Sequence, residues 1–197
     1  MLEFFDIQNI IVAYGYLGIF LIIFLESGIF FPLPGDSLLF AAGLFAATGG
    51  FNVFFLFVLV FTASWLGILS GYYIGGRILK LRGRPLFRKI LKREHLDSAG
   101  DFFARHGRQA IVLSRFVPIV RTFVPITAGA ARMDYLSFVQ WSFLGSLVWS
   151  GLLIFSGFFL GRIFPQAQDY FLPIVIIIII LSLLPGIFQF FRKKHRV

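Results

Sequence analysis

Phe31-Pro32-Leu33-Pro34-Gly35-Asp36 interrupts an apolar sequence with prolines and a glycine, which cannot continue a helix. Proline lacks the backbone N–H that a helix interior needs, and glycine permits a tight turn. Residues 37–76 then follow without one charged side chain, and this run divides at Gly49-Gly50. The part before the division is shorter than the roughly 17–25 residues of a membrane span. We therefore predict a re-entrant hairpin over 32–50 and a transmembrane helix over 51–76.

The composition places the chain in a membrane. Of its residues 58% are hydrophobic and 14% are charged, which is more apolar surface than a soluble domain of this length can hide. Residues 10–31 are apolar except for Glu26 and predict a first membrane helix. Residues 1–9 lack Lys and Arg, so we expect no cleavable signal peptide. The absence of cysteine excludes disulfides and thiolate metal sites.

The basic residues predict an orientation. Residues 77–108 hold ten of the 18 Lys and Arg side chains, with apolar residues at helical spacing among them. This pattern favours a basic amphipathic segment on the membrane surface, where it would contact anionic lipid rather than nucleic acid. The positive-inside rule places this segment and the basic tail 192–196 in the cytoplasm. We expect a multi-pass protein of the bacterial cytoplasmic (inner) membrane with both termini cytoplasmic.

The second half of the chain repeats the first. Residues 109–131, which we expect to be broken at Pro118 and Pro125, predict a second re-entrant hairpin, and 133–161 predict a transmembrane helix. A last membrane helix is predicted over 170–191. At one offset of 86 residues, Pro32 falls on Pro118, Ala42-Gly43 on Ala128-Gly129, and residues 70–75 on 156–161.

The predicted fold is therefore a single all-α polytopic membrane domain over residues 1–197. It contains an inverted repeat of two re-entrant hairpins, each followed by a long transmembrane helix, with flanking N- and C-terminal membrane helices. Six residues are expected to shape the hairpins: Pro32, Pro34, Gly35, Pro118, Pro125 and Gly129.

Four charges fall at membrane depth: Glu26, Asp36, Arg115 and Arg121. An ionisable group at the bilayer centre costs about 2.5–3.5 kcal/mol on insertion scales, so each is a candidate functional residue. They could pair and only lock the hairpins together. Alternatively, the two arginines could bind a lipid phosphate, because their planar fork matches phosphate oxygens, while the carboxylates could carry protons or gate the site. Broken helices favour the second interpretation, since a lock does not need them.

Catalysis is not indicated. Serines at membrane depth, such as Ser114 and Ser150, have no histidine partner, so neither a nucleophile–base pair nor a catalytic residue is predicted. The three histidines are not spaced as metal ligands. We expect no metal and no cofactor, and the sequence is compatible with a homo-oligomer.

The sequence resembles the DedA family of membrane proteins, also called the SNARE-associated or VTT-domain family. The resemblance covers roughly residues 10–190. It is carried by Glu26 with Phe31-Pro32-Leu33-Pro34-Gly35-Asp36, and by Arg115-Phe116-Val117-Pro118-Ile119-Val120-Arg121-Thr122. It implies two opposed re-entrant hairpins, lipid transport that depends on the proton motive force, and undecaprenyl phosphate or a phospholipid as substrate. It also implies that the four charges match the essential residues of the family.

We therefore predict a proton-linked lipid translocase whose partners are membrane lipids and protons. Arg115 and Arg121 would hold the phosphate of a polyprenyl phosphate or phospholipid, and Glu26 and Asp36 would couple or gate. Two alternatives stay open: an ion or small-cation antiporter that uses the same carboxylates, and a scaffold protein that shapes the membrane.

Overall fold

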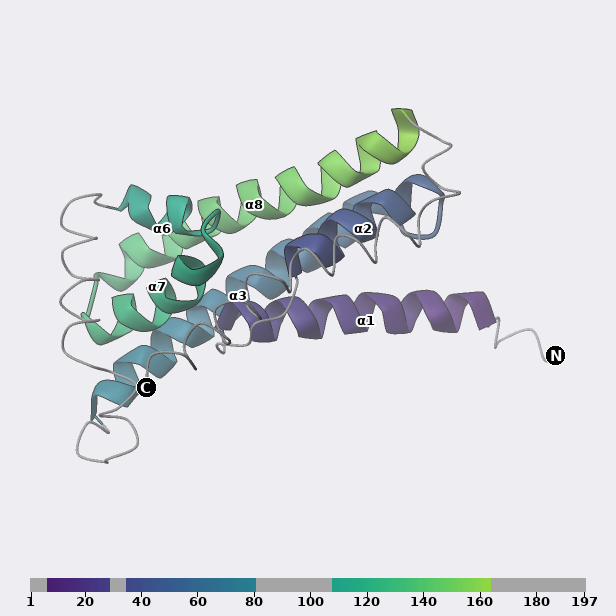
Figure 1. The fold of residues 1–197 in the computed structure, drawn as a ribbon. Helices are drawn as coiled ribbons and strands as arrows, with labels where there is room; N and C mark the ends of the chain where they lie inside the picture. The colour runs from purple at the N-terminus through teal and green to yellow at the C-terminus, as the bar shows by residue number, and fades with distance from the viewer. Residues whose placement is uncertain (1–6, 29–34, 81–107, 164–197) are drawn as a thin grey trace, which may run out of the picture. The chain divides into compact units, whose positions relative to one another are not determined.

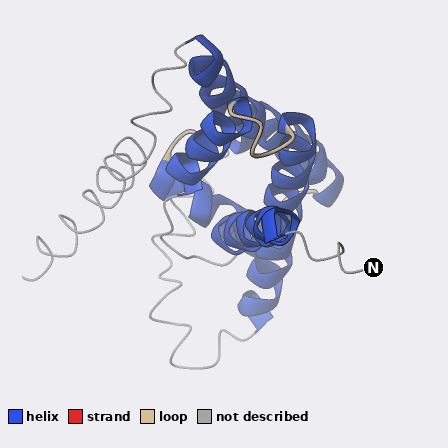
Figure 2. Ribbon diagram, turned by 90° about the vertical axis from the view of Figure 1, so that its right-hand side faces the viewer, coloured by secondary structure: helices blue, strands red, loops and turns tan. Residues whose placement is uncertain are grey.

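The computed structural model describes residues 7–28, 35–80 and 108–163, and every regular element in these ranges is an α-helix (Figures 1 and 2). The helices are α1 (Ile7–Gly28), α2 (Gly35–Ala47), α3 (Val53–Lys80), α6 (Gln109–Ser114), α7 (Pro118–Ala130) and α8 (Tyr135–Ile163). The predicted all-α class is thus confirmed for these ranges. Pro32, Pro34, most of the predicted basic segment 77–108 and the predicted helix 170–191 lie outside the described residues.

Within the described ranges, two helices are long and apolar enough to cross a membrane, and they are the longest ribbons in Figure 1. These spans are Val53–Arg77 in α3, with 25 residues, and Tyr135–Ile163 in α8, with 29 residues. A span needs about 20 residues. Large apolar side chains are exposed along both helices, including Phe54 and Leu136. Such surfaces suit lipid rather than water. The re-entrant course of the shorter helices stays a prediction.

Each long helix begins at a polar cap. The side-chain oxygen of Asn52 accepts hydrogen bonds from the backbone N–H groups of Phe54 and Phe55, at 3.1 and 3.0 Å, at the start of α3. The carboxylate of Asp134 accepts one from Ser137 N–H, at 2.8 Å, at the start of α8. These caps satisfy N–H groups that have no partner inside the helix. The hydrogen bonds from Ser137 hold the pKa of Asp134 below its usual value.

Residues 109–131 form two helices rather than three pieces. The chain breaks after α6, where Val117 is extended with φ −115° and ψ 104°, and Pro118 begins α7. This agrees with the preference of proline for the first helical turn and of the residue before it for an extended conformation. The predicted break at Pro125 is wrong, because α7 continues through it. Pro125 is buried beside Gly71 of α3, whose missing side chain leaves room for the proline ring.

The described residues divide into two compact units. The first contains the described residues 7–22, 35–60 and 150–163, and within it α2 packs directly against α8. A Cβ atom at Gly43 would meet the backbone carbonyl of Ile154. A Cβ atom at Gly157 would likewise meet the carbonyl of Phe40.

The second unit contains the described residues 23–28, 61–80 and 108–149, and within it α7 packs against α3 in the same manner. A Cβ atom at Gly75 would meet the carbonyl of Ile126, and one at Gly129 would meet the carbonyl of Tyr72. Gly129 is the residue that matches Gly43 at the 86-residue offset, and Ile126 matches Phe40. In both units, therefore, a short helix packs through glycine against the long helix of the other half of the chain.

This packing predicts that Gly75→Ala destabilises the protein while Gly76→Ala does not. A methyl group at Gly75 has to push the backbone of α7 away, and overpacking of this kind costs about 1–3 kcal/mol. At Gly76, the nearest atom to an added Cβ is the Gly129 carbonyl oxygen at 3.6 Å, an ordinary contact. Thermal unfolding in detergent should show a lowered midpoint for Gly75→Ala only. Equal midpoints for the two variants would contradict the close approach of α7 to α3.

Candidate functional site

The break between α6 and α7 carries two buried arginines of the second unit. Arg115 follows the last residue of α6, and Arg121 lies in the first turn of α7. Only 4% of Arg115 and 8% of Arg121 are exposed. Pro118 accounts for the placement of both arginines, because the chain leaves α6 before this proline and begins α7 at it. The sequence thus places two cations inside a protein unit rather than at its surface.

Arg115 is bound by helices α3 and α8. Its Nη2 atom donates to the hydroxyl of Ser64 in α3, and to the hydroxyl of Ser146 in α8 at 3.1 Å. Both serines are fully buried. The guanidinium also lies over the ring of Trp149 in α8, with 5.1 Å from Cζ to the ring centroid. A cation–π contact of this kind is strongest where water is excluded.

Arg121 forms an ion pair with Glu26 of α1. Its Nη2 atom donates to Oε1 of Glu26, and only 4% of Glu26 is exposed. Arg121 also lies over the ring of Trp149, with 5.4 Å from Cζ to the centroid. Removing one partner of a buried pair leaves a charge without compensation and costs about 3–5 kcal/mol. The pair therefore connects α1 firmly to α7 within the second unit.

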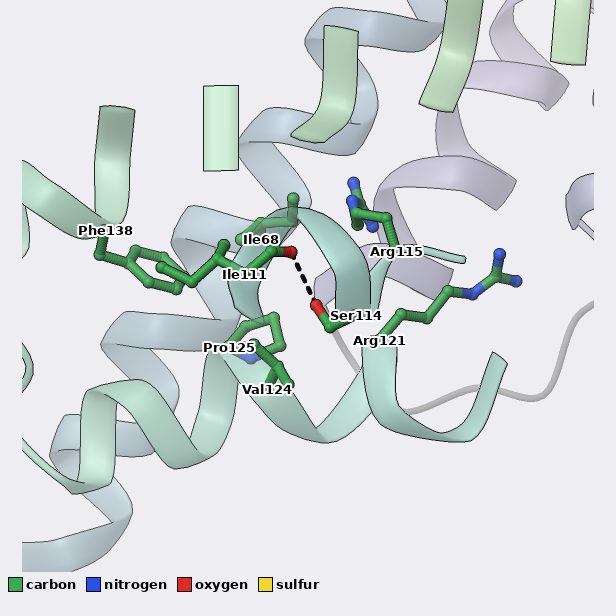
Figure 3. A pocket seen from close by; sticks show the side chains of 8 residues that line it. All are labelled: Ile68, Ile111, Ser114, Arg115, Arg121, Val124, Pro125 and Phe138. Carbon is green, nitrogen blue, oxygen red and sulfur yellow. Dashed lines mark hydrogen bonds between the residues drawn. The ribbon is translucent and has the colours of Figure 1, made fainter. Parts of the chain in front are cut away.

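A small cavity adjoins the two arginines. Figure 3 shows Arg115 and Arg121 on one side of it and the ring of Phe138 on the other. Its volume is about 10 Å³, on the scale of one water molecule. Ser114 also lines it and donates to the carbonyl of Ile111 at 2.7 Å. A phosphate group is larger than this cavity, so a ligand of that kind requires side chains to move.

The structure brings together three of the four charges that the sequence predicted. Glu26, Arg115 and Arg121 share one unit, and Arg115 and Arg121 share a contact with Trp149. Asp36, in the first turn of α2, is half-buried and belongs to the first unit, so its pairing with an arginine stays a prediction.

Four of the six residues predicted to shape the hairpins lie in the described ranges, among them Pro118 and Pro125, which are placed above. Gly35 is the buried first residue of α2, and Gly129 lies in the contact between α7 and α3. Among the described residues, no three His, Asp or Glu side chains gather as a metal site needs. The expected absence of a metal remains a prediction.

Three site residues were missed by the sequence analysis: Ser64, Ser146 and Trp149. Serine and tryptophan are ordinary in membrane helices and give no charge signal. One signal was present, because Ser146 and Trp149 are three residues apart and therefore share a helix face.

The fold and the site define an all-helical membrane protein with charged side chains buried between its helices. The family model of the VTT domain matches residues 33–159. The chain is 39% identical over 200 residues to Protein DedA of Escherichia coli (strain K12), an alignment that covers 96% of this chain and 89% of that protein. The chain therefore belongs to the VTT-domain family, also called the DedA family.

Two further relatives carry names that concern activity. Undecaprenyl phosphate transporter A of Staphylococcus aureus (strain NCTC 8325 / PS 47) is 30% identical over 203 residues, with 97% of this chain and 98% of that protein covered. Alkaline phosphatase-like protein of Lactococcus lactis subsp. lactis (strain IL1403) is 28% identical over 190 residues, with coverages of 92% and 88%. A comparison with solved structures finds no match.

Proposed function

We propose that this protein transports a phosphate-bearing lipid, undecaprenyl phosphate or a related phospholipid, across the bacterial cytoplasmic membrane. The observation that carries the proposal is the pair of buried arginines at the break between α6 and α7. Burying cations in a membrane protein is costly, and a structure that bears this cost twice in one place suits an anionic substrate. The name of the Staphylococcus aureus relative supports the same substrate class.

The two arginines would act in different ways. Arg115 donates to two hydroxyl groups, which are neutral and can yield to phosphate oxygens without leaving a buried charge. Arg121 holds a carboxylate, so a phosphate must compete with Glu26 for the same fork. We therefore expect the phosphate to contact Arg115 first and to engage Arg121 only when Glu26 withdraws.

This competition provides a route to proton coupling. A proton on Glu26 neutralises the carboxylate, weakens its hold on Arg121 and frees the guanidinium for phosphate. Proton and phosphate would then load together, and loss of the proton would return Arg121 to Glu26 and expel the lipid. Asp36 would be a second coupling or gating carboxylate, as the sequence predicts. Lipid would consequently move in the direction of proton flow.

We propose transport rather than catalysis. The hydroxyl groups of Ser64 and Ser146 face Arg115, which keeps its proton in proteins and so cannot act as a general base. A phosphatase, as the name of the Lactococcus relative suggests for that protein, would release inorganic phosphate from the lipid. If the purified protein releases inorganic phosphate and the Arg115→Lys variant does not, the protein has a catalytic activity, and transport is not its only function.

Lysine substitutions test the phosphate site. Arg115→Lys and Arg121→Lys keep the charge but lose the bidentate fork, so each should reduce the flux of labelled polyprenyl phosphate in proteoliposomes roughly tenfold or more. Arg162→Lys makes the same change at an exposed arginine of α8 and should leave flux unchanged. Gel filtration and circular dichroism establish that the variants are folded. Normal flux in both Arg115→Lys and Arg121→Lys would contradict a direct contact between these arginines and the phosphate.

A pH gradient tests the coupling. Wild-type flux should increase when the donor side is more acidic, and Glu26→Gln should abolish this dependence, because it keeps the shape of the side chain and cannot titrate. The control is Asp134→Asn, which changes an exposed carboxylate outside the site. Glu26→Gln also weakens a buried ion pair and so lowers the stability of the protein. The double variant Glu26→Gln/Arg121→Gln removes both charges, so it should recover stability while its flux stays independent of the pH gradient. Wild-type flux that ignores the gradient would refute proton coupling.

Thiol labelling tests the orientation and the second re-entrant hairpin. Gln109 and Ala131 are exposed at the two ends of residues 109–131, so Gln109→Cys and Ala131→Cys should both react with an impermeant reagent from the cytoplasmic side only. Thr48→Cys, in the exposed turn after α2, should react from outside in intact cells. The chain has no cysteine of its own, so the background is clean. Labelling of Gln109→Cys and Ala131→Cys from opposite sides would show a spanning segment instead.

A further inference from the structure

Trp149 of α8 contacts both arginines of the site. The distances from its ring centroid to Cζ of Arg115 and of Arg121 are 5.1 and 5.4 Å, inside the range of about 6 Å for a cation–π contact. Tryptophan attracts cations more strongly than the other aromatic rings. Only 3% of Trp149 is exposed, so the contact lies in the same water-poor interior as the two guanidiniums.

We propose that Trp149 is a positioning residue, which holds the guanidinium groups of Arg115 and Arg121 together so that one phosphate group binds both. The proposal rests on the proposed function, the transport of a phosphate-bearing lipid. It assigns to Trp149 a part in setting the separation of the two arginines, because its ring contacts both guanidiniums.

The distances fit this role. The two Cζ atoms can be no further apart than the sum of their distances to the shared centroid, 10.5 Å. A guanidinium that binds phosphate oxygens bidentately has its carbon roughly 4 Å from the phosphorus, so two forks on one phosphate stand roughly 8 Å apart. The shared ring therefore keeps the two guanidiniums at most 10.5 Å apart, close to the roughly 8 Å that two forks on one phosphate span, so a small approach of the side chains lets one phosphate bind both.

The hydrogen bonds described for the two arginines go to different residues. Arg115 donates to Ser64 of α3 and Ser146 of α8, whereas Arg121 donates to Glu26 of α1. The two guanidiniums repel each other because both are positively charged. Hydrogen bonds to different residues do not by themselves hold them close together. Trp149 attracts both. If it were removed, each arginine would keep its own partner and the unit would stay folded, but the phosphate would have to draw the two side chains together.

The size of the effect follows from preorganisation. Each long side chain that becomes ordered only on binding weakens the complex by several-fold, so two arginines together give roughly tenfold. Trp149→Leu should therefore weaken the binding of a phosphate lipid roughly tenfold. Trp149→Phe keeps a ring with a weaker attraction for cations, and should weaken binding about threefold.

The experiment measures Kd for two probes with the full chain in detergent. The probes are a fluorescent short-chain polyprenyl phosphate and the uncharged polyprenol with the same label. The control variant is Trp65→Leu. Trp65 is stacked on Phe61 at 6.1 Å between centroids and packs edge-on against Phe143 at 5.3 Å. Trp65→Leu therefore makes the same substitution in the same unit at a ring that packs on aromatic side chains.

We expect the order wild type, Trp149→Phe, Trp149→Leu in decreasing affinity for the phosphate probe, with the affinity for polyprenol unchanged and Trp65→Leu equal to wild type. Equal affinity of wild type and Trp149→Leu for the phosphate probe would overturn the proposal. So would equal losses for both probes, which would show a general structural role. If Trp149→Leu aggregates, Trp149→Phe decides alone. A wild type that does not prefer phosphate to polyprenol would instead overturn the proposed function.

Discussion

The ion pair between Glu26 and Arg121 is the constraint on which the second unit depends. Both groups are buried, and a charge in a low-dielectric interior must have a partner close by. Arg121 lies at the beginning of α7, one turn after the break at Pro118, and Glu26 lies near the end of α1. The pair therefore determines where α7 begins relative to α1. Arg115, six residues earlier, is then brought to α3 and α8, where two serines accept its hydrogen bonds.

Direct backbone contact at glycines is what allows such short helices to hold these charges. α2 and α7 have 13 residues each, too few to span a membrane and too few to bury a large apolar face. They pack instead by close approach of backbones, as helices in membranes do where small residues meet. Because Gly43 and Gly129 occupy matching positions in the two halves of the chain, both units use the same kind of contact. The scaffold is repeated, but the charges on it are not: the acidic residues belong to the first half of the sequence and the arginines to the second.

The sequence revealed those parts of the site that contrast with an apolar chain. Glu26, Arg115 and Arg121 are conspicuous because an ionisable residue at membrane depth is expensive. Ser64 and Ser146 were not predicted, because their bonds to Arg115 join residues 51 and 31 positions away and depend on the tertiary structure. The break predicted at Pro125 is absent for a different reason. Proline in a helix removes one hydrogen bond, and α7 tolerates that loss because Pro125 is buried against Gly71 of α3.

The size of the cavity limits how a ligand can enter. About 10 Å³ admits a water molecule, so a phosphate needs movement of either a helix or side chains. Sliding α7 along α3 would drive the carbonyl groups of Ile126 and Tyr72 into Gly75 and Gly129, where no slack exists. The arginine side chains, in contrast, are long and can rotate, and the Ser64 and Ser146 hydroxyl groups that Arg115 releases when it does are neutral. We therefore expect the first step of loading to be a rotation of the Arg115 side chain while the α7–α3 contact stays fixed. The release of Arg121 from Glu26 should be the slower step, because it separates a buried ion pair.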